Sequence, residues 1–134
     1  MKYIICFLFS LTIYNTAVGQ NKTEKTFKDG EYTMKQYYFV MLTKGERRNE
    51  ITETAIINKL QAGHLANIGK LAKEGKILVA GPFGDDGNWR GIFIFDCERK
   101  EEVEQLLNTD PAIAAGRLAY EIHPWWTAKN AVFK

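Results

Sequence analysis

The chain has 134 residues, which is long enough for one domain with its own hydrophobic core. Its 18 Lys and Arg residues nearly balance its 16 Asp and Glu residues, and a net charge of +2 gives no basis for a nucleic acid or an anionic membrane surface as a partner. Hydrophobic residues make up 46% and charged residues 25%, as in an ordinary globular protein.

Residues 1–19 differ from the rest and predict a secretory signal peptide. Lys2 precedes a short apolar run, and small residues close it. The run is shorter than the about 20 residues of a membrane-spanning helix, although an uncleaved membrane anchor stays open as the alternative. We therefore expect a periplasmic or secreted protein that has no membrane contact after cleavage. Cleavage would remove Cys6 and leave Cys97 without an internal disulfide partner, so the domain would depend on its core.

The elements of the fold can be predicted in chain order. Polar residues 20–34 are typical of a flexible leader, and the folded domain is expected over residues 35–134. Aromatic and β-branched residues predict the first strand at 37–43. Residues 52–74 follow a helical period, with apolar residues three or four positions apart, and Gly75 stands where a left-handed helix stop belongs.

The second half of the chain continues this alternation. Apolar residues 77–81 predict a second strand, residues 82–88 a turn and residues 90–97 a third strand. A second helix is predicted at 100–108 and a fourth strand at 118–122.

The order strand, helix, strand, strand, helix, strand predicts a ferredoxin-like α+β fold. Two right-handed crossovers joined by a hairpin place a four-stranded antiparallel sheet against two helices on one face. Apolar side chains on the other face need a cover, so we expect a homodimer in which a second copy lies against that face.

His64 is the first candidate for a functional residue. It lies on the apolar stripe of the helix predicted at 52–74, and an imidazole can accept or donate a proton near neutral pH when a partner fixes its tautomer. The alternative is a core histidine satisfied by one backbone carbonyl. Gly63, immediately before it, leaves room for another group to approach.

Asp110 is the second candidate. An aspartate directly before Pro111 is typical of a helix N-cap, and capping alone would account for it; Gly116 would then close a short helical turn. If this turn folds back under the first helix, Asp110 could instead orient His64, and the two would form a base and its orienting partner.

Binding residues are expected around the turn between the second and third strands. Arg90 could hold an anionic or oxygen-rich ligand through its planar guanidinium, the alternative being a solvated arginine at a strand edge. Gly81 and Pro82 lack the spacing of a phosphate loop but allow close backbone approach and a tight turn. Trp125 could roof a pocket or pack across a subunit interface. No metal site is expected, because the two histidines lack a further ligand with supporting spacing.

Six short motifs, in this order and spacing, make the chain resemble the YCII-related (YciI-like) family from the first strand to the tryptophans. The motifs are Gly63-His64-Leu65, Glu74-Gly75-Lys76, Ala80-Gly81-Pro82-Phe83, Arg90-Gly91, Asp110-Pro111 with Gly116, and Pro124-Trp125. The resemblance implies a ferredoxin-like domain that assembles into a dimeric α/β barrel.

The resemblance also implies a site and an activity. The family's histidine and aspartate correspond by position to His64 and Asp110, and one branch performs cofactor-free dehydrochlorination of a hydroxylated aromatic compound. We therefore expect an exported enzyme without a cofactor that moves protons on a small cyclic or aromatic oxygenated compound. The alternatives are a non-catalytic periplasmic domain that binds a small ligand and a structural dimeric domain. Export departs from the cytoplasmic members typical of the family, so an intracellular catabolic role does not transfer.

Overall fold

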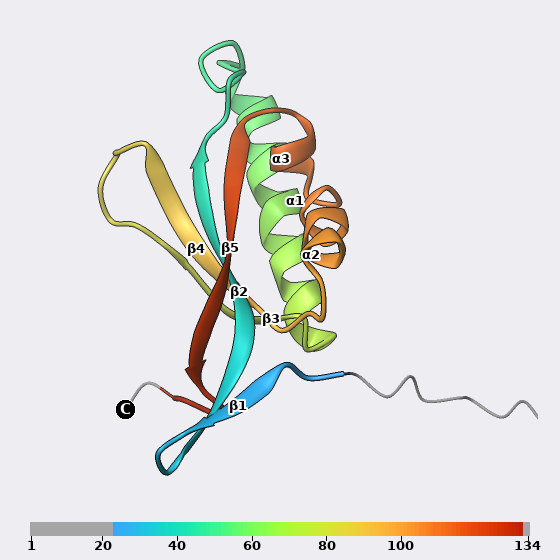
Figure 1. Cartoon of the computed structure of the whole chain (residues 1–134). Helices are drawn as coiled ribbons and strands as arrows, with labels where there is room; N and C mark the ends of the chain where they lie inside the picture. Colours follow the sequence, from blue (N-terminus) through green and yellow to red (C-terminus); the bar gives the residue numbers. More distant parts are fainter. Residues whose placement is uncertain (1–22, 133–134) are drawn as a thin grey trace, which may run out of the picture.

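The computed structural model describes residues 23–132, and the predicted signal peptide at 1–19 lies outside them. The strands form one antiparallel sheet, and the helices cover one of its faces (Figure 1). No helix within the described range is both long and apolar enough to span a membrane. The elements are β1 (Thr26–Asp29), β2 (Tyr32–Lys44), α1 (Thr54–Lys73), β3 (Ile77–Pro82), β4 (Trp89–Phe95), α2 (Lys100–Leu107), α3 (Pro111–Ala114) and β5 (Leu118–Ala128).

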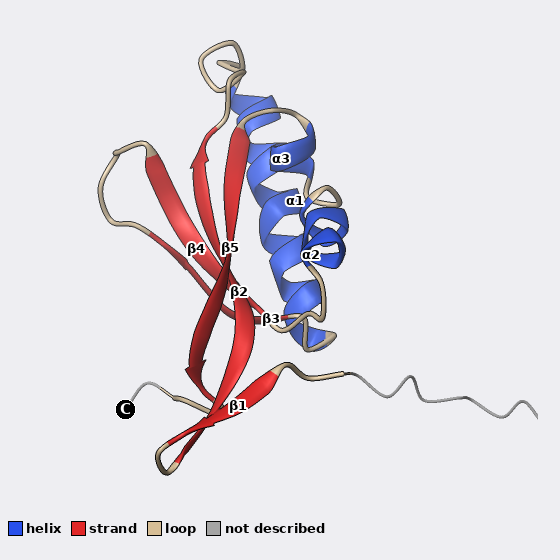
Figure 2. Ribbon diagram, viewed as in Figure 1, coloured by secondary structure: helices blue, strands red, loops and turns tan. Residues whose placement is uncertain are grey.

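The sheet has the strand order of a ferredoxin-like domain. β2 lies at its centre, with β5 along one side and β4 along the other, and β3 pairs with the far edge of β4. The first crossover runs through α1 and the second through α2 and α3, all on the same face (Figure 2). The predicted α+β fold is confirmed.

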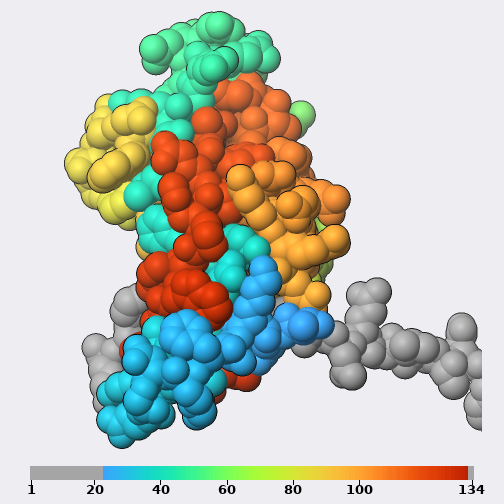
Figure 3. Space-filling model, viewed as in Figure 1, coloured from blue at the N-terminus to red at the C-terminus, as the bar shows by residue number. Residues whose placement is uncertain are grey.

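The structure corrects the flexible leader predicted at residues 20–34, because the described part of that segment is paired. β1 is antiparallel to residues 32–35 at the start of β2, and the hairpin adjoins the C-terminal end of β5 (Figure 3). Glu24 holds the hairpin in place, since its carboxylate accepts hydrogen bonds from buried Lys35 at 2.8 Å and from Lys129 after β5. A strand stabilised by backbone pairing and ion pairs leaves no apolar pattern in the sequence.

β5 is longer than the strand predicted at 118–122 and continues through Pro124 to Ala128. Proline has no N–H for a sheet ladder and is confined to edge strands. Within the described residues β5 pairs only with β2, so β5 is an edge strand. Pro124 is in register with Tyr38 of β2, and the strand continues past the proline.

The core fills the space between the sheet and the helices. Alternate residues of β2 face the helices, which is the period expected of a strand covered on one side. Cys97 belongs to this buried cluster. The cluster comprises Tyr38, Val40, Leu42, Leu71, Ile77, Phe93, Phe95, Cys97, Val103 and Leu107.

The opposite face of the sheet is also apolar at its centre. Phe39 and Met41 of β2 are in register with Ile94 and Ile92 of β4, and no described helix covers them. This arrangement is the one from which a second copy was predicted, and the dimer stays a prediction.

Two glycines end helices as the sequence predicts. Gly75 after α1 has a φ of 68° and Gly116 after α3 has a φ of 74°, the left-handed conformation that glycine adopts without strain. Behind Gly116, the N–H of Arg117 donates to the carbonyl of Ala112 at 3.0 Å, which closes the last turn. This closure sets the direction in which the chain enters β5, and therefore the position of Arg117.

The ion pairs of Glu24 predict a pH dependence of stability. Hydrogen bonds from Lys129 and then Lys35 lower the pKa of Glu24 from 4.5 to about 2. Because the folded state binds this proton less tightly than the unfolded state, the contribution is fully present above about pH 4.5 and is lost as the pH falls toward about 2. We expect the melting temperature of the wild type to fall more steeply over this range than that of Glu24→Gln.

Circular dichroism melts at a series of pH values would measure this difference. Glu31→Gln, which removes an exposed carboxylate from the turn between β1 and β2, is the control and should keep the wild-type slope. Equal slopes for the wild type and Glu24→Gln would contradict the role of Glu24.

Candidate functional site

The structure brings His64 and Asp110 together. Nδ1 of His64, in the middle of α1, lies 2.6 Å from Oδ2 of Asp110, which precedes α3. Both side chains are buried, with His64 8% exposed and Asp110 1% exposed. The other carboxylate oxygen, Oδ1, accepts a hydrogen bond from the N–H of Ala112 at 2.8 Å. Asp110 is therefore both the predicted helix cap and the predicted partner of the histidine, one oxygen serving each contact.

This contact depends on how closely α1 approaches α3. A Cβ placed on Gly63 would lie 2.5 Å from Cγ of Pro111, so only glycine lets the proline ring pack against the helix at this point. The hydroxyl of Thr109 donates to the side-chain carbonyl oxygen of Asn67 at 3.1 Å and ties the same two segments together. The group for which Gly63 leaves room is thus Pro111. Because Pro111 packs against α1 at this point, the preceding residue, Asp110, lies within hydrogen-bond distance of His64.

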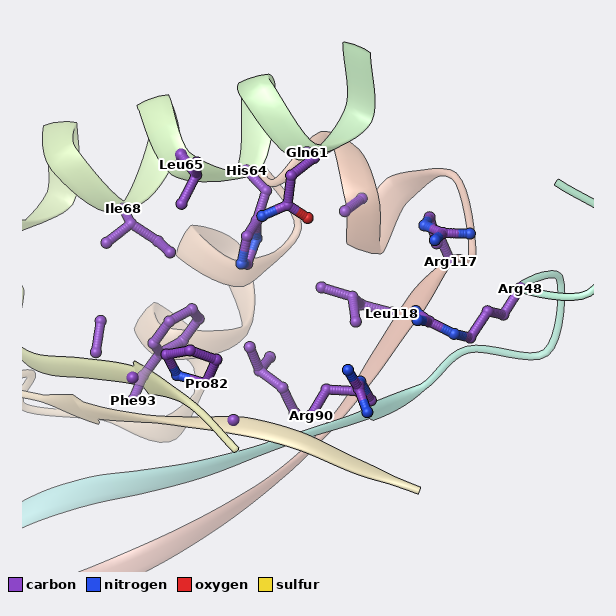
Figure 4. Close-up of a pocket in the computed structure, with 15 residues that line it drawn as sticks. Arg48, Gln61, His64, Leu65, Ile68, Pro82, Arg90, Phe93, Arg117 and Leu118 are labelled. Atoms are coloured by element: carbon purple, nitrogen blue, oxygen red, sulfur yellow. The ribbon is translucent and has the colours of Figure 1, made fainter. Parts of the chain in front are cut away.

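The His64 ring reaches a cavity through its second nitrogen. The ring lies between α1 and the sheet, 6.1 Å from the ring of Phe93 between centroids, and lines a cavity of about 360 Å³ (Figure 4). Among the described residues, no buried side-chain nitrogen or oxygen lacks a hydrogen-bond partner, and the hydrogen bond of the ring is made through Nδ1. Nε2 is therefore open to the cavity. With Asp110 ionised, the proton sits on Nδ1 and Nε2 carries the lone pair that can accept another proton.

The predicted binding residues reach the cavity with one exception. Arg90, Gly81 and Pro82 all line it. Arg90 also holds the turn between β3 and β4, because its Nη1 donates to the carbonyl of Asp85 at 3.0 Å and to the carboxylate of Asp86 at 3.2 Å.

Trp125 does not reach this cavity. It lies on β5 beside Tyr37, with ring centroids 6.5 Å apart, and is 41% exposed. The structure therefore corrects its assignment as a pocket residue within one chain. The physical reason is that the cavity lies at the first residue of β5, Leu118, whereas Trp125 lies near the other end of the strand.

Among the described residues no group of three or more His, Cys, Asp or Glu side chains could hold a metal ion.

Two arginines that the sequence did not single out also line the cavity. Arg48 comes from the loop after β2, and Arg117 is the residue immediately before β5. Both are positioned by backbone contacts: the N–H of Gly45 donates to the carbonyl of Arg117 at 3.1 Å, and a Cβ on Gly45 would lie only 2.2 Å from the carbonyl oxygen of Gly116. Arg48 lies between the strand predicted at 37–43 and the helix predicted at 52–74, where the sequence predicted no functional residue. The position of Arg117 directly after a helix stop was the one sequence signal that could have marked it.

The electrostatics of the cavity are positive. Burial lowers the pKa of Arg48, and the charges of Arg117 and Arg90 lower it further. The negative charge of Asp86 acts in the opposite direction and raises this pKa. Figure 4 shows the three guanidinium groups gathered toward one end of the cavity, with Leu65, Ile68 and Phe93 toward the other.

The fold and the site together define a ferredoxin-like domain with a buried histidine–aspartate pair that opens onto a cavity. The model of the YCII-related domain matches residues 38–126, and the chain belongs to this family. No curated protein matches the chain. A solved structure similar to it is 5-chloro-2-hydroxyhydroquinone dehydrochlorinase (TftG) from Burkholderia phenoliruptrix AC1100 in complex with 2,5-dihydroxybenzoquinone. The two share 24% sequence identity over 66% of this chain and 92% of that chain, with a TM-score of 0.49.

The close packing at Gly63 predicts opposite effects for two glycine substitutions in α1. Ala in place of Gly gains about 1 kcal/mol in a helix interior, and we expect Gly69→Ala to gain stability because nothing lies within 4 Å of its added Cβ. Gly63→Ala should instead lose about 1–3 kcal/mol, because the added methyl overlaps the ring of Pro111. Urea unfolding measures both free energies. Equal stabilisation by the two substitutions would show that α1 and α3 are not in close contact.

Proposed function

We propose that this protein is an exported enzyme that uses no cofactor and transfers protons on a small cyclic or aromatic oxygenated compound. The observation that carries the proposal is the 2.6 Å contact between His64 Nδ1 and Asp110 Oδ2, with the other ring nitrogen open to a cavity. A buried carboxylate behind an imidazole that faces a substrate-sized space is the arrangement of a general base with its orienting partner.

The roles follow from the donor and acceptor chemistry of each group. Asp110 keeps the proton of the neutral imidazole on Nδ1 and stabilises the imidazolium that forms when Nε2 takes a proton from the substrate. The imidazolium then returns that proton at another substrate atom or to a leaving group, so the histidine acts first as base and then as acid. Arg90 has Nη2 and Nε beyond the Nη1 group that bonds the turn, and these can stabilise negative charge on a substrate oxygen beside the backbone of Gly81.

Assembly and location complete the proposal. A second copy against the face formed by Phe39, Met41, Ile92 and Ile94 would bury the apolar side chains that no described helix covers. The apolar start of the sequence supports export to the periplasm or beyond.

A non-catalytic role is the second candidate, and the double use of Asp110 favours it. A carboxylate that caps α3 and binds His64 could be present for stability alone, in a domain that binds a small ligand or only assembles. In that case His64→Ala would cost about 1–3 kcal/mol by leaving one oxygen of a buried carboxylate without its partner and would change nothing else.

Asp110→Asn separates the two candidates. Asparagine caps helices as well as aspartate does, so α3 keeps its cap. Its side-chain amide, turned toward Nδ1, would place the imidazole proton on Nε2, which could then accept no proton. We expect an activity loss of about 100-fold to 10,000-fold with the fold intact.

Deuterium incorporation in D2O from a panel of hydroquinones, lactones and cyclic ketones would detect the proton transfer by mass spectrometry. His64→Gln should lose the activity in the same way. His123→Gln is the control, because His123 is exposed on β5 outside the cavity and should leave the activity unchanged. Full activity in both Asp110→Asn and His64→Gln would rule out the proposed mechanism and leave the non-catalytic role.

A further inference from the structure

The cavity holds three cations and little to balance them. Arg48 makes no side-chain hydrogen bond or ion pair with any described residue, and the guanidinium of Arg117 donates only to the carbonyl of Ile51, at 3.4 Å. Of the three arginines, Arg90 is the one that forms an ion pair with a described carboxylate, that of Asp86, and the Asp86 side chain is 85% exposed. No Asp or Glu is among the described residues that line the cavity.

This excess of positive charge is costly to the protein without a ligand. Burial and the two neighbouring guanidiniums both lower the pKa of Arg48, so its environment disfavours the charge that the side chain carries. Half-buried like charges repel one another more strongly than charges in water, because the surrounding protein screens them less. An anion in the cavity would reverse the sign of this interaction.

The backbone holds these charges where they are. The N–H of Arg47 donates to the carbonyl of Gly116 at 3.0 Å, and the approach of Gly45 to Gly116 leaves no space for a side chain. The loop that carries Arg48 is thereby fixed against the residue that precedes Arg117. Arg48 and Arg117, brought together by these contacts, are a built feature of the fold rather than solvated side chains that happen to meet.

We infer that the cavity binds a small planar organic anion, a carboxylate or phenolate, through the guanidinium groups of Arg48 and Arg117. The inference rests on the proposed function only in taking this anion to be the substrate. Planar guanidinium groups match the geometry of carboxylate oxygens with paired hydrogen bonds.

The rest of the cavity favours an organic anion over an inorganic one. Leu65, Ile68 and Phe93 line the end away from the arginines, and an apolar ring would lie against them. A volume of about 360 Å³ is near the lower limit of ligand pockets, which suits a compound with a single ring. Inorganic phosphate would leave the apolar end empty.

The charge pattern also bears on the proton transfer. When His64 removes a proton from a conjugated substrate, negative charge spreads into the group that the arginines hold. Arg48 and Arg117 would therefore stabilise the product of proton removal as well as the bound substrate, which deepens the role proposed for Arg90.

Equilibrium binding of benzoate and benzamide tests the inference without requiring turnover. The two probes have the same shape, but benzoate is an anion near neutral pH and benzamide is neutral. We expect benzoate to bind about tenfold more tightly than benzamide, and Arg48→Gln and Arg117→Gln each to weaken benzoate binding by about tenfold or more. NMR titration that follows the His64 ring signals reports both affinity and location.

Arg47→Gln is the matched control. Arg47 is adjacent to Arg48, but its exposed side chain pairs with Glu50 and does not line the cavity. This variant should leave benzoate affinity within about twofold of the wild type. Equal affinities for benzoate and benzamide, or equal effects of Arg47→Gln and Arg48→Gln, would overturn the inference.

Thermal unfolding without ligand provides a second readout. Because Arg48 has no hydrogen-bond or ion-pair partner among the described residues and is repelled by Arg117 and Arg90, we expect Arg48→Gln to melt at or above the wild-type temperature, and a clear decrease would show a structural role instead. The two proposals fail separately. Arginine-dependent benzoate binding by a protein without proton-transfer activity would refute the proposed enzyme and keep the anion site. Activity that needs His64, together with benzoate binding that is unchanged in Arg48→Gln and Arg117→Gln, would refute the anion site and keep the enzyme.

Discussion

The site depends on one buried carboxylate that serves two partners. Asp110 accepts the N–H of Ala112 with one oxygen and lies against Nδ1 of His64 with the other. The first contact stabilises the start of a helix of only four residues, which has little stability of its own, and the second fixes the orientation of the imidazole. A carboxylate that is 1% exposed is costly unless its oxygens are satisfied, so each contact helps to stabilise the other.

Close backbone approach is what converts local sequence features into this site. Gly63 lets Pro111 pack against α1, and Gly45 lets the loop after β2 pack against Gly116. The first contact assembles the histidine–aspartate pair, and the second brings Arg48 and Arg117 together. Both contacts lie where α3 meets the rest of the fold. This helix of only four residues is therefore the element on which both halves of the cavity depend.

The sequence predicted the fold better than it predicted the site. Helical and strand periods, with glycine stops at Gly75 and Gly116, were enough to place the ferredoxin-like elements, because each of those signals is local. The strand β1 was missed because its stabilisation comes from pairing and from Glu24, which leave no periodic pattern. His64 and Asp110 were identified because a histidine on an apolar stripe and an Asp-Pro step stand out locally. Arg48 and Arg117 could not be found in this way, because 69 positions separate them in the sequence (117 minus 48) and only tertiary packing brings their charges together.

The two halves of the cavity impose an order on the proposed chemistry. An imidazolium formed at His64 has the same sign of charge as the three guanidiniums, so proton transfer into an empty or neutral cavity would add a fourth cation to an already positive space. Asp110 balances one charge, but its carboxylate lies behind the ring and is already shared with Ala112. A negative charge on the substrate, held by the arginines, supplies the remaining compensation from the cavity side. In the proposed mechanism the arginines select an anionic substrate, and the charge of that substrate offsets the charge of the imidazolium, so binding of the anion would precede the proton transfer.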